Sequence, residues 1–149
     1  MQHNRERLSN HILPMSKSSN FDSAVGEWDF VSAEFHDGEQ CPCGQPIKEV
    51  CFIRNRETGY ETHVGNVCVG KFMGMDTGNL FSGLKRLIEK PDSNPNQAVI
   101  DYAAKKELIY KGEINFLTQT KNKRKLSPSQ LSWKRKINWR IINEVKVVN

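Results

Sequence analysis

The sequence has no long apolar run, and this absence excludes two classes of protein. Nothing in its 149 residues approaches the ~20 apolar residues of a membrane-spanning helix. The first twenty residues also lack the apolar core that a secretory leader requires. We therefore expect a protein of the cytoplasm, or of a host cell's nucleus or cytoplasm if it is viral, with no membrane partner.

The chain is also poor in hydrophobic residues, which make up 37% of it, and its mean hydropathy is −0.63. A core of that size is lean for a single large domain, although three Trp and seven Phe are too many for a disordered chain. Small domains with lean cores commonly gain stability from a covalent or metal staple. The sequence therefore predicts such a staple.

Recognisable catalytic motifs are missing as well. The sequence contains no HExxH pair and no HxE followed by CxxC, the patterns that accompany catalytic zinc. A Cys68–His63 pair has no evident third partner for nucleophilic catalysis. We therefore predict that the protein is not an enzyme.

Four cysteines indicate the kind of staple. Cys41-Pro42-Cys43-Gly44 forms a tight loop with two thiols, and Cys68 falls where a helix is predicted to begin. In a reducing compartment such thiols are more often metal ligands than disulfides, and thiolates suit Zn²⁺. The sequence therefore predicts one structural zinc site that holds a fold together.

The fourth ligand of this site has three candidates. Cys51 completes a four-cysteine set with Cys41, Cys43 and Cys68, and is the first choice. His63 and His36 are the alternatives, each with an ordinary non-ligand interpretation as a strand or loop residue. A buried Cys51 would equally fit as a small hydrophobic residue.

The segments around the cysteines predict a sheet. Residues 28–36 alternate as a strand does, and residues 48–55 and 60–67 are β-rich runs separated by Arg56-Glu57-Thr58-Gly59. A four-residue loop sets the hairpin register, so that Arg54 faces Glu61 and Cys51 faces Val64. The order of loop, hairpin and helix is typical of a treble-clef-like finger.

The stretch CPCGQPIKEVCFIRNRETGYETHVGNVCVGKF, residues 41–72, resembles small zinc-finger-like modules of the treble-clef or zinc-ribbon kind. Such modules recur in proteins of viruses, phages and mobile elements. The resemblance implies metal binding without a reaction. This sequence departs from the commoner knuckle, which spaces its cysteines by two residues and takes two ligands from the helix.

The remainder of the chain predicts helices. A Pro- and Asn-rich linker begins at Pro91, and Asn94-Pro95 is expected to open a helix that ends near Tyr110. Ser127 and Gln130 form a capping box at the start of the last helix. The prediction is an α+β protein with a polar arm at 1–20, a zinc-stapled hairpin domain at 21–90 and a basic, mostly helical module at 94–149.

Positive charge is concentrated in the C-terminal third. Residues 102–149 hold twelve Lys and Arg against three acidic residues, a net charge of +9, whereas residues 1–101 carry −4. The basic residues lie in a short loop and on the last helix, with one tryptophan among them. Phosphate contacts and base stacking use these residue types. The predicted nucleic-acid-binding residues are Lys121, Lys123, Arg124, Lys125, Arg135, Lys136, Trp139 and Arg140.

The sequence thus predicts a non-catalytic zinc-binding protein that contacts DNA or RNA through its basic C-terminal region. The alternative is a regulator or inhibitor of viral or phage type that docks its basic face on an acidic protein. A charge run can also be a simple solvated face. The two hypotheses differ in the binding partner, and both include the zinc site.

Overall fold

The computed structural model describes residues 2–146, and these divide into two compact units, residues 2–77 and residues 78–146. The first unit holds a three-stranded antiparallel sheet with flanking helices, and the second is helical. The predicted α+β class is confirmed. No helix among residues 2–146 is long and apolar enough to cross a membrane.

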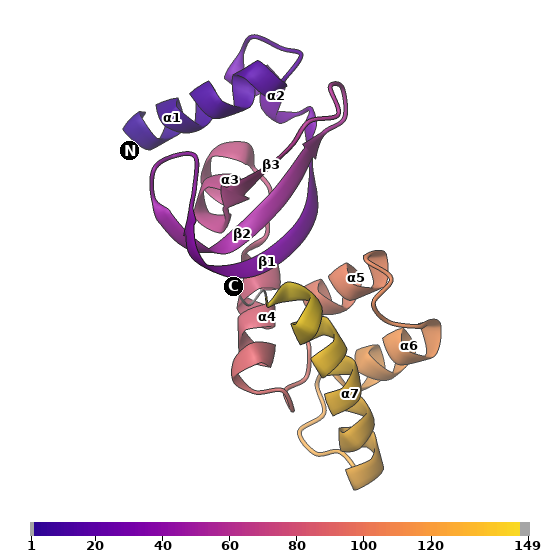
Figure 1. The fold of residues 1–149 in the computed structure, drawn as a ribbon. Helices are drawn as coiled ribbons and strands as arrows, with labels where there is room; N and C mark the ends of the chain where they lie inside the picture. Colours follow the sequence, from indigo (N-terminus) through magenta and orange to yellow (C-terminus); the bar gives the residue numbers. More distant parts are fainter. Residues whose placement is uncertain (1, 147–149) are drawn as a thin grey trace. The chain divides into compact units, whose positions relative to one another are not determined.

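The sheet has the order β1-β2-β3, formed by Trp28–Gln40, Pro46–Asn55 and Glu61–Gly65. The register places Arg54 opposite Glu61 and Cys51 opposite Val64, as the loop length predicted. Arg54 Nε donates to Glu61 Oε1 at 2.9 Å. Two irregularities in β1 bend that strand, and the sheet curls around helix α3, Asn66–Met73 (Figure 1).

The N-terminal segment is part of the first unit. Helix α1, Gln2–Ile12, contacts α3 and buries Leu8 and Ile12 completely. A short 3-10 turn, Leu13–Met15, and helix α2, Phe21–Val25, lead into β1. The Glu27 carboxylate then accepts hydrogen bonds from the backbone N–H groups of Lys17 and Ser18 at 2.8 and 2.9 Å. The residues expected to form a polar arm therefore contribute to the core.

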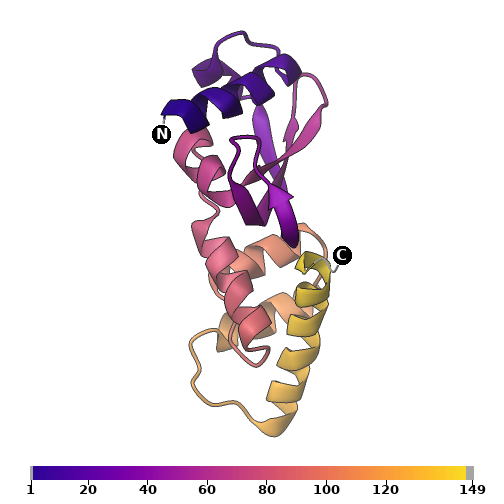
Figure 2. The same cartoon turned by 60° about the vertical axis from the view of Figure 1, so that its left-hand side comes forward.

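Four helices build the second unit: α4 Gly78–Glu89, α5 Gln97–Lys105, α6 Lys111–Thr120 and α7 Pro128–Val145. Helix α4 contacts α5 and α7, and α5 contacts α6 (Figure 2). The Ser127–Gln130 capping box forms as predicted, with Gln130 N donating to Ser127 Oγ at 3.2 Å. Ile137, Ile141, Ile142 and Val145 on α7 are buried.

Three boundaries differ from the expectation. Helix α5 ends at Lys105 and not near Tyr110, which instead caps the start of α6. Helix α5 begins after Asn96, whose side chain accepts from Val99 N at 2.9 Å, so Asn96 and not Asn94 is the cap. Asn94 instead bonds to the segment that follows α6, donating to Lys123 O at 2.7 Å. The linker that begins at Pro91 lies inside the second unit, because α4 packs with the helices that follow it.

We expect Leu8→Ala to lower the free energy of unfolding by about 2–5 kcal/mol, because it leaves a cavity where α1 packs into the core. Glu6→Ala on the same helix is the control, since Glu6 is exposed and its loss should change stability by less than ~0.5 kcal/mol. Urea unfolding followed by circular dichroism measures both. Equal stabilities of the two variants would contradict the packed position of α1.

Candidate metal centre and basic groove

The Cys41-Pro42-Cys43-Gly44 loop is a tight knuckle closed by backbone hydrogen bonds. Gly44 N donates to Cys41 O at 2.8 Å, and Cys41 N donates to Gln45 O at 2.8 Å. Gly44 has φ +101°, a conformation that L side chains rarely adopt, and a Cβ there would collide with the Arg7 guanidinium. The glycine therefore lets the chain reverse with both thiols on one side.

Cys68 reaches the knuckle because β3 runs directly into α3. Gly65 ends the strand and precedes the helix, and Cys68 lies in the first turn of α3. Gly65 N donates to Cys41 Sγ at 3.4 Å, and a Cβ on Gly65 would lie 2.9 Å from Ile47 Cγ2. The missing side chain allows this close approach, which brings the start of the helix against the loop.

The three thiols form one cluster. The Sγ atoms of Cys41, Cys43 and Cys68 lie within 4.8 Å of one another, and all three residues are buried. Zinc–sulfur bonds of ~2.3 Å in a tetrahedron place sulfur atoms ~3.8 Å apart, so small side-chain adjustments would fit the cluster to a metal ion. Three soft, buried ligands in this arrangement could hold one ion.

Hydrogen bonds within the cluster make one thiol acidic. The Cys68 thiol and the N–H groups of Cys43 and Gly65 point at Cys41 and lower the pKa of its thiol to about 5 against the opposing effect of burial. The same contact raises the pKa of Cys68 above its ordinary value, because its proton is held by Cys41. A cation would favour the thiolate form of all three and displace the shared protons.

Cys51 is not part of this cluster. It lies on β2, fully buried between its neighbours Ala33 and Val64 on the adjacent strands. Burial raises the pKa of its thiol to about 12, the contact with Thr77 opposing the shift only in part. In this position Cys51 packs as a small hydrophobic residue, which was the alternative to a role as metal ligand.

The two histidine alternatives also lie outside the cluster. His63 Nε2 contacts Gln40 O at 3.0 Å and Glu39 Oε2 at 3.9 Å. His36 Nε2 contacts Glu34 Oε1 at 2.7 Å. The structure thus brings together three of the four predicted cysteines, and among the described residues no fourth Cys, His, Asp or Glu joins the group.

A cavity of about 390 Å³ lies beside the thiols. Its lining combines the three cysteines with apolar side chains such as Ile47 and Phe72 and with the polar residue Asn4 of α1. Asn4 and Arg7 were missed by sequence reasoning, because nothing in a polar N-terminal segment shows that it packs beside a knuckle about forty residues away.

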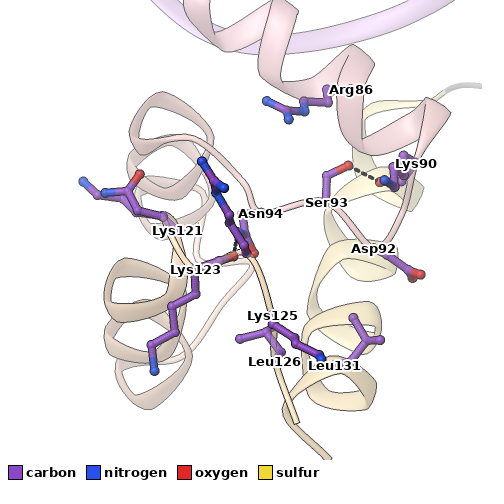
Figure 3. A pocket seen from close by; sticks show the side chains of 12 residues that line it. Arg86, Lys90, Asp92, Ser93, Asn94, Lys121, Lys123, Lys125, Leu126 and Leu131 are labelled. Carbon is purple, nitrogen blue, oxygen red and sulfur yellow. Dashed lines mark hydrogen bonds between the residues drawn. The ribbon is translucent and has the colours of Figure 1, made fainter. Parts of the chain in front are cut away.

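The four basic residues of the 121–125 segment gather at a groove in the second unit. The groove has a volume of about 570 Å³. Arg86 of α4 and Lys90, which directly follows that helix, lie on one side of it, and Lys121 and Lys123 lie on the opposite side (Figure 3). We call it the basic groove, and its basic lining residues are Arg86, Lys90, Lys121, Lys123, Arg124 and Lys125.

The residues predicted on α7 divide into two groups. Arg135 pairs with Asp92, Nε to Oδ1 at 2.5 Å and Nη2 to Oδ2 at 3.0 Å. Arg140 binds the Glu113 carboxylate through both terminal nitrogens at 2.8 and 2.9 Å. These two guanidinium groups each have a carboxylate partner within the unit, whereas Lys136 and Trp139 are exposed side chains.

Comparison with protein-family models, with curated proteins and with solved structures gave no significant match. Function is therefore argued from the geometry of the chain itself.

We expect the purified protein to bind about one zinc ion, and Cys41→Ser, Cys43→Ser and Cys68→Ser each to reduce the bound zinc severely and lower Tm. Cys51→Ala is the matched control, since it also removes a buried thiol but should retain the metal. Elemental analysis of the proteins and thermal melts with and without a chelator measure these effects. A Cys51→Ala variant that stays folded but loses its zinc would place Cys51 in the metal centre.

Proposed function

We propose that this chain is a non-catalytic zinc-binding protein that contacts nucleic acid through the basic residues of its C-terminal helical unit. The observation that carries the metal assignment is the convergence of three buried thiols from a loop and a helix distant in sequence. Zinc bound there would tie residues 41–43 to the start of α3. Its contribution is structural, as in other small zinc-stapled folds.

A structural role is favoured over a catalytic one by the surroundings of the thiols. Catalytic zinc works beside a group that exchanges protons, usually a carboxylate or an imidazole. The described residues that line the adjacent cavity include neither Asp, Glu nor His.

Contact with nucleic acid is supported by the exposed basic side chains of the second unit. Lys123, Arg124 and Lys125 are exposed, and they form no ion pair with a carboxylate of the described residues. Trp139 is 49% exposed, which leaves part of its indole ring free to stack on an unpaired base. Cations without internal partners are available to phosphates.

We expect labelled DNA or RNA oligonucleotides to bind with an affinity that falls steeply with salt, because each neutralised phosphate releases condensed counterions. Fluorescence anisotropy between 50 and 200 mM salt measures the slope. Affinity that is flat over this range would contradict phosphate contact. Capture of an acidic protein that survives nuclease treatment, with no binding to oligonucleotides, would favour the regulator alternative instead.

A further inference from the structure

The basic groove concentrates positive charge from two separate parts of the second unit, the end of α4 with the following Lys90 and the segment from Lys121 to Lys125. The loop from Pro91 to Asn96 also contributes to its lining. Of its twelve lining residues, six are basic and one is acidic. Sequence reasoning found the four basic residues of one segment but missed Arg86 and Lys90, because nothing local shows that α4 ends beside that segment.

The single acidic residue of the groove does not neutralise the six cations. Asp92 is bound through both carboxylate oxygens by Arg135 of α7, and this contact lowers the pKa of Asp92. Its interaction with Lys90 is a weaker, longer-range one. Within residues 78–146, Arg86, Lys123, Arg124 and Lys125 form no ion pair with a carboxylate. Most of the positive charge of the groove therefore has no carboxylate partner among residues 78–146.

The floor of the groove is held by side-chain hydrogen bonds. Asn94 Nδ2 donates to Lys123 O at 2.7 Å, which ties the basic segment to the loop (Figure 3). Asn138 of α7 donates to Pro91 O and Ser93 O at 2.7 and 2.9 Å. The basic side chains thus project from a fixed backbone, and less ordering entropy is lost when a ligand binds.

A further cation is buried next to this floor. Lys134 of α7 is fully buried, and its ammonium group donates to Asn94 Oδ1. Its only other neighbour of electrostatic weight among the described residues is the Phe116 ring, with Nζ 5.9 Å from the centroid. No carboxylate of residues 2–146 pairs with it, and burial lowers its pKa. Buried charges are costly without a partner, so this one favours an anion nearby.

We propose that the basic groove is a binding site for the phosphodiester backbone of a nucleic acid. The ammonium group of Lys134, which has no carboxylate partner and donates to the lining residue Asn94, adds positive charge next to the groove. The inference rests on the proposed function and gives it a location. Leu126 and Leu131 are the apolar residues among the lining, too few for the apolar anchors that dominate protein interfaces. Phosphate backbones, in contrast, are bound by charge and polar contacts alone.

The test compares two triple variants of equal charge. Lys90→Ala, Lys123→Ala and Lys125→Ala remove three cations of the groove, and Lys105→Ala, Lys106→Ala and Lys111→Ala remove three exposed lysines outside it. The probe is a labelled single-stranded oligonucleotide, and thermal melts check that both variants fold. The groove variant should lower the slope of log affinity against log salt by about 2, at ~0.7 for each phosphate contact, and the control by much less.

Equal losses in the two variants would overturn the groove assignment while leaving nucleic-acid binding in place. Absence of binding by the unaltered protein would overturn the proposed function together with the groove. A nucleoside triphosphate added as competitor distinguishes a site for isolated phosphates from one for a chain. It should displace the oligonucleotide only weakly, and full displacement at equal phosphate concentration would overturn the assignment to a backbone.

Lys134→Met separates binding from packing. Replacing a buried, unpaired cation with an apolar side chain of similar length should leave Tm unchanged or raise it. If the ammonium group acts on the ligand, affinity for the oligonucleotide should still fall by roughly fivefold at low salt. A lowered Tm with unchanged affinity would overturn the role given to Lys134.

Discussion

The first unit depends on the close approach of a glycine-containing loop to the start of a helix. Gly65 allows β3 and α3 to meet the knuckle, and Gly44 allows the knuckle to reverse beneath Arg7. Three thiols then share a space that suits one metal ion. Without a cation, three buried thiols share hydrogen bonds and one easily lost proton; with one, the same atoms become a cross-link between the two segments.

The second unit is organised around the loop from Pro91 to Asn96. Two residues of helix α7 bind this loop. Arg135 pairs with Asp92 of the loop, and Asn138 donates to two of its backbone carbonyl groups. Polar residues of α7 therefore point inward at the level of the loop, and apolar residues take over toward the C-terminal end of the helix. The basic groove is a consequence, because the fixed loop sets α4 and the 121–126 segment beside each other.

Much of the local structure could be predicted because short-range chemistry determines it. The loop length and the Arg54–Glu61 pair determined the hairpin register, and the Ser127–Gln130 capping box determined where α7 begins. The sequence analysis made no prediction for Lys134 and Asn138, which the structure shows to be buried. Both continue the helical spacing of Leu131, Ile141 and Val145, and that spacing was the available signal that they face inward.

By itself, the sequence determined the fold class, the paired thiols of the knuckle and the concentration of positive charge near the C-terminus, since each depends on composition or on residues close along the chain. The tertiary structure alone decided that Cys51 stays in the sheet, apart from the three clustered thiols. It also decided that Arg140 pairs with Glu113 while Arg86 joins the groove. The physical reason is that ligand sets and ion pairs require atoms within a few ångströms, and packing determines those distances.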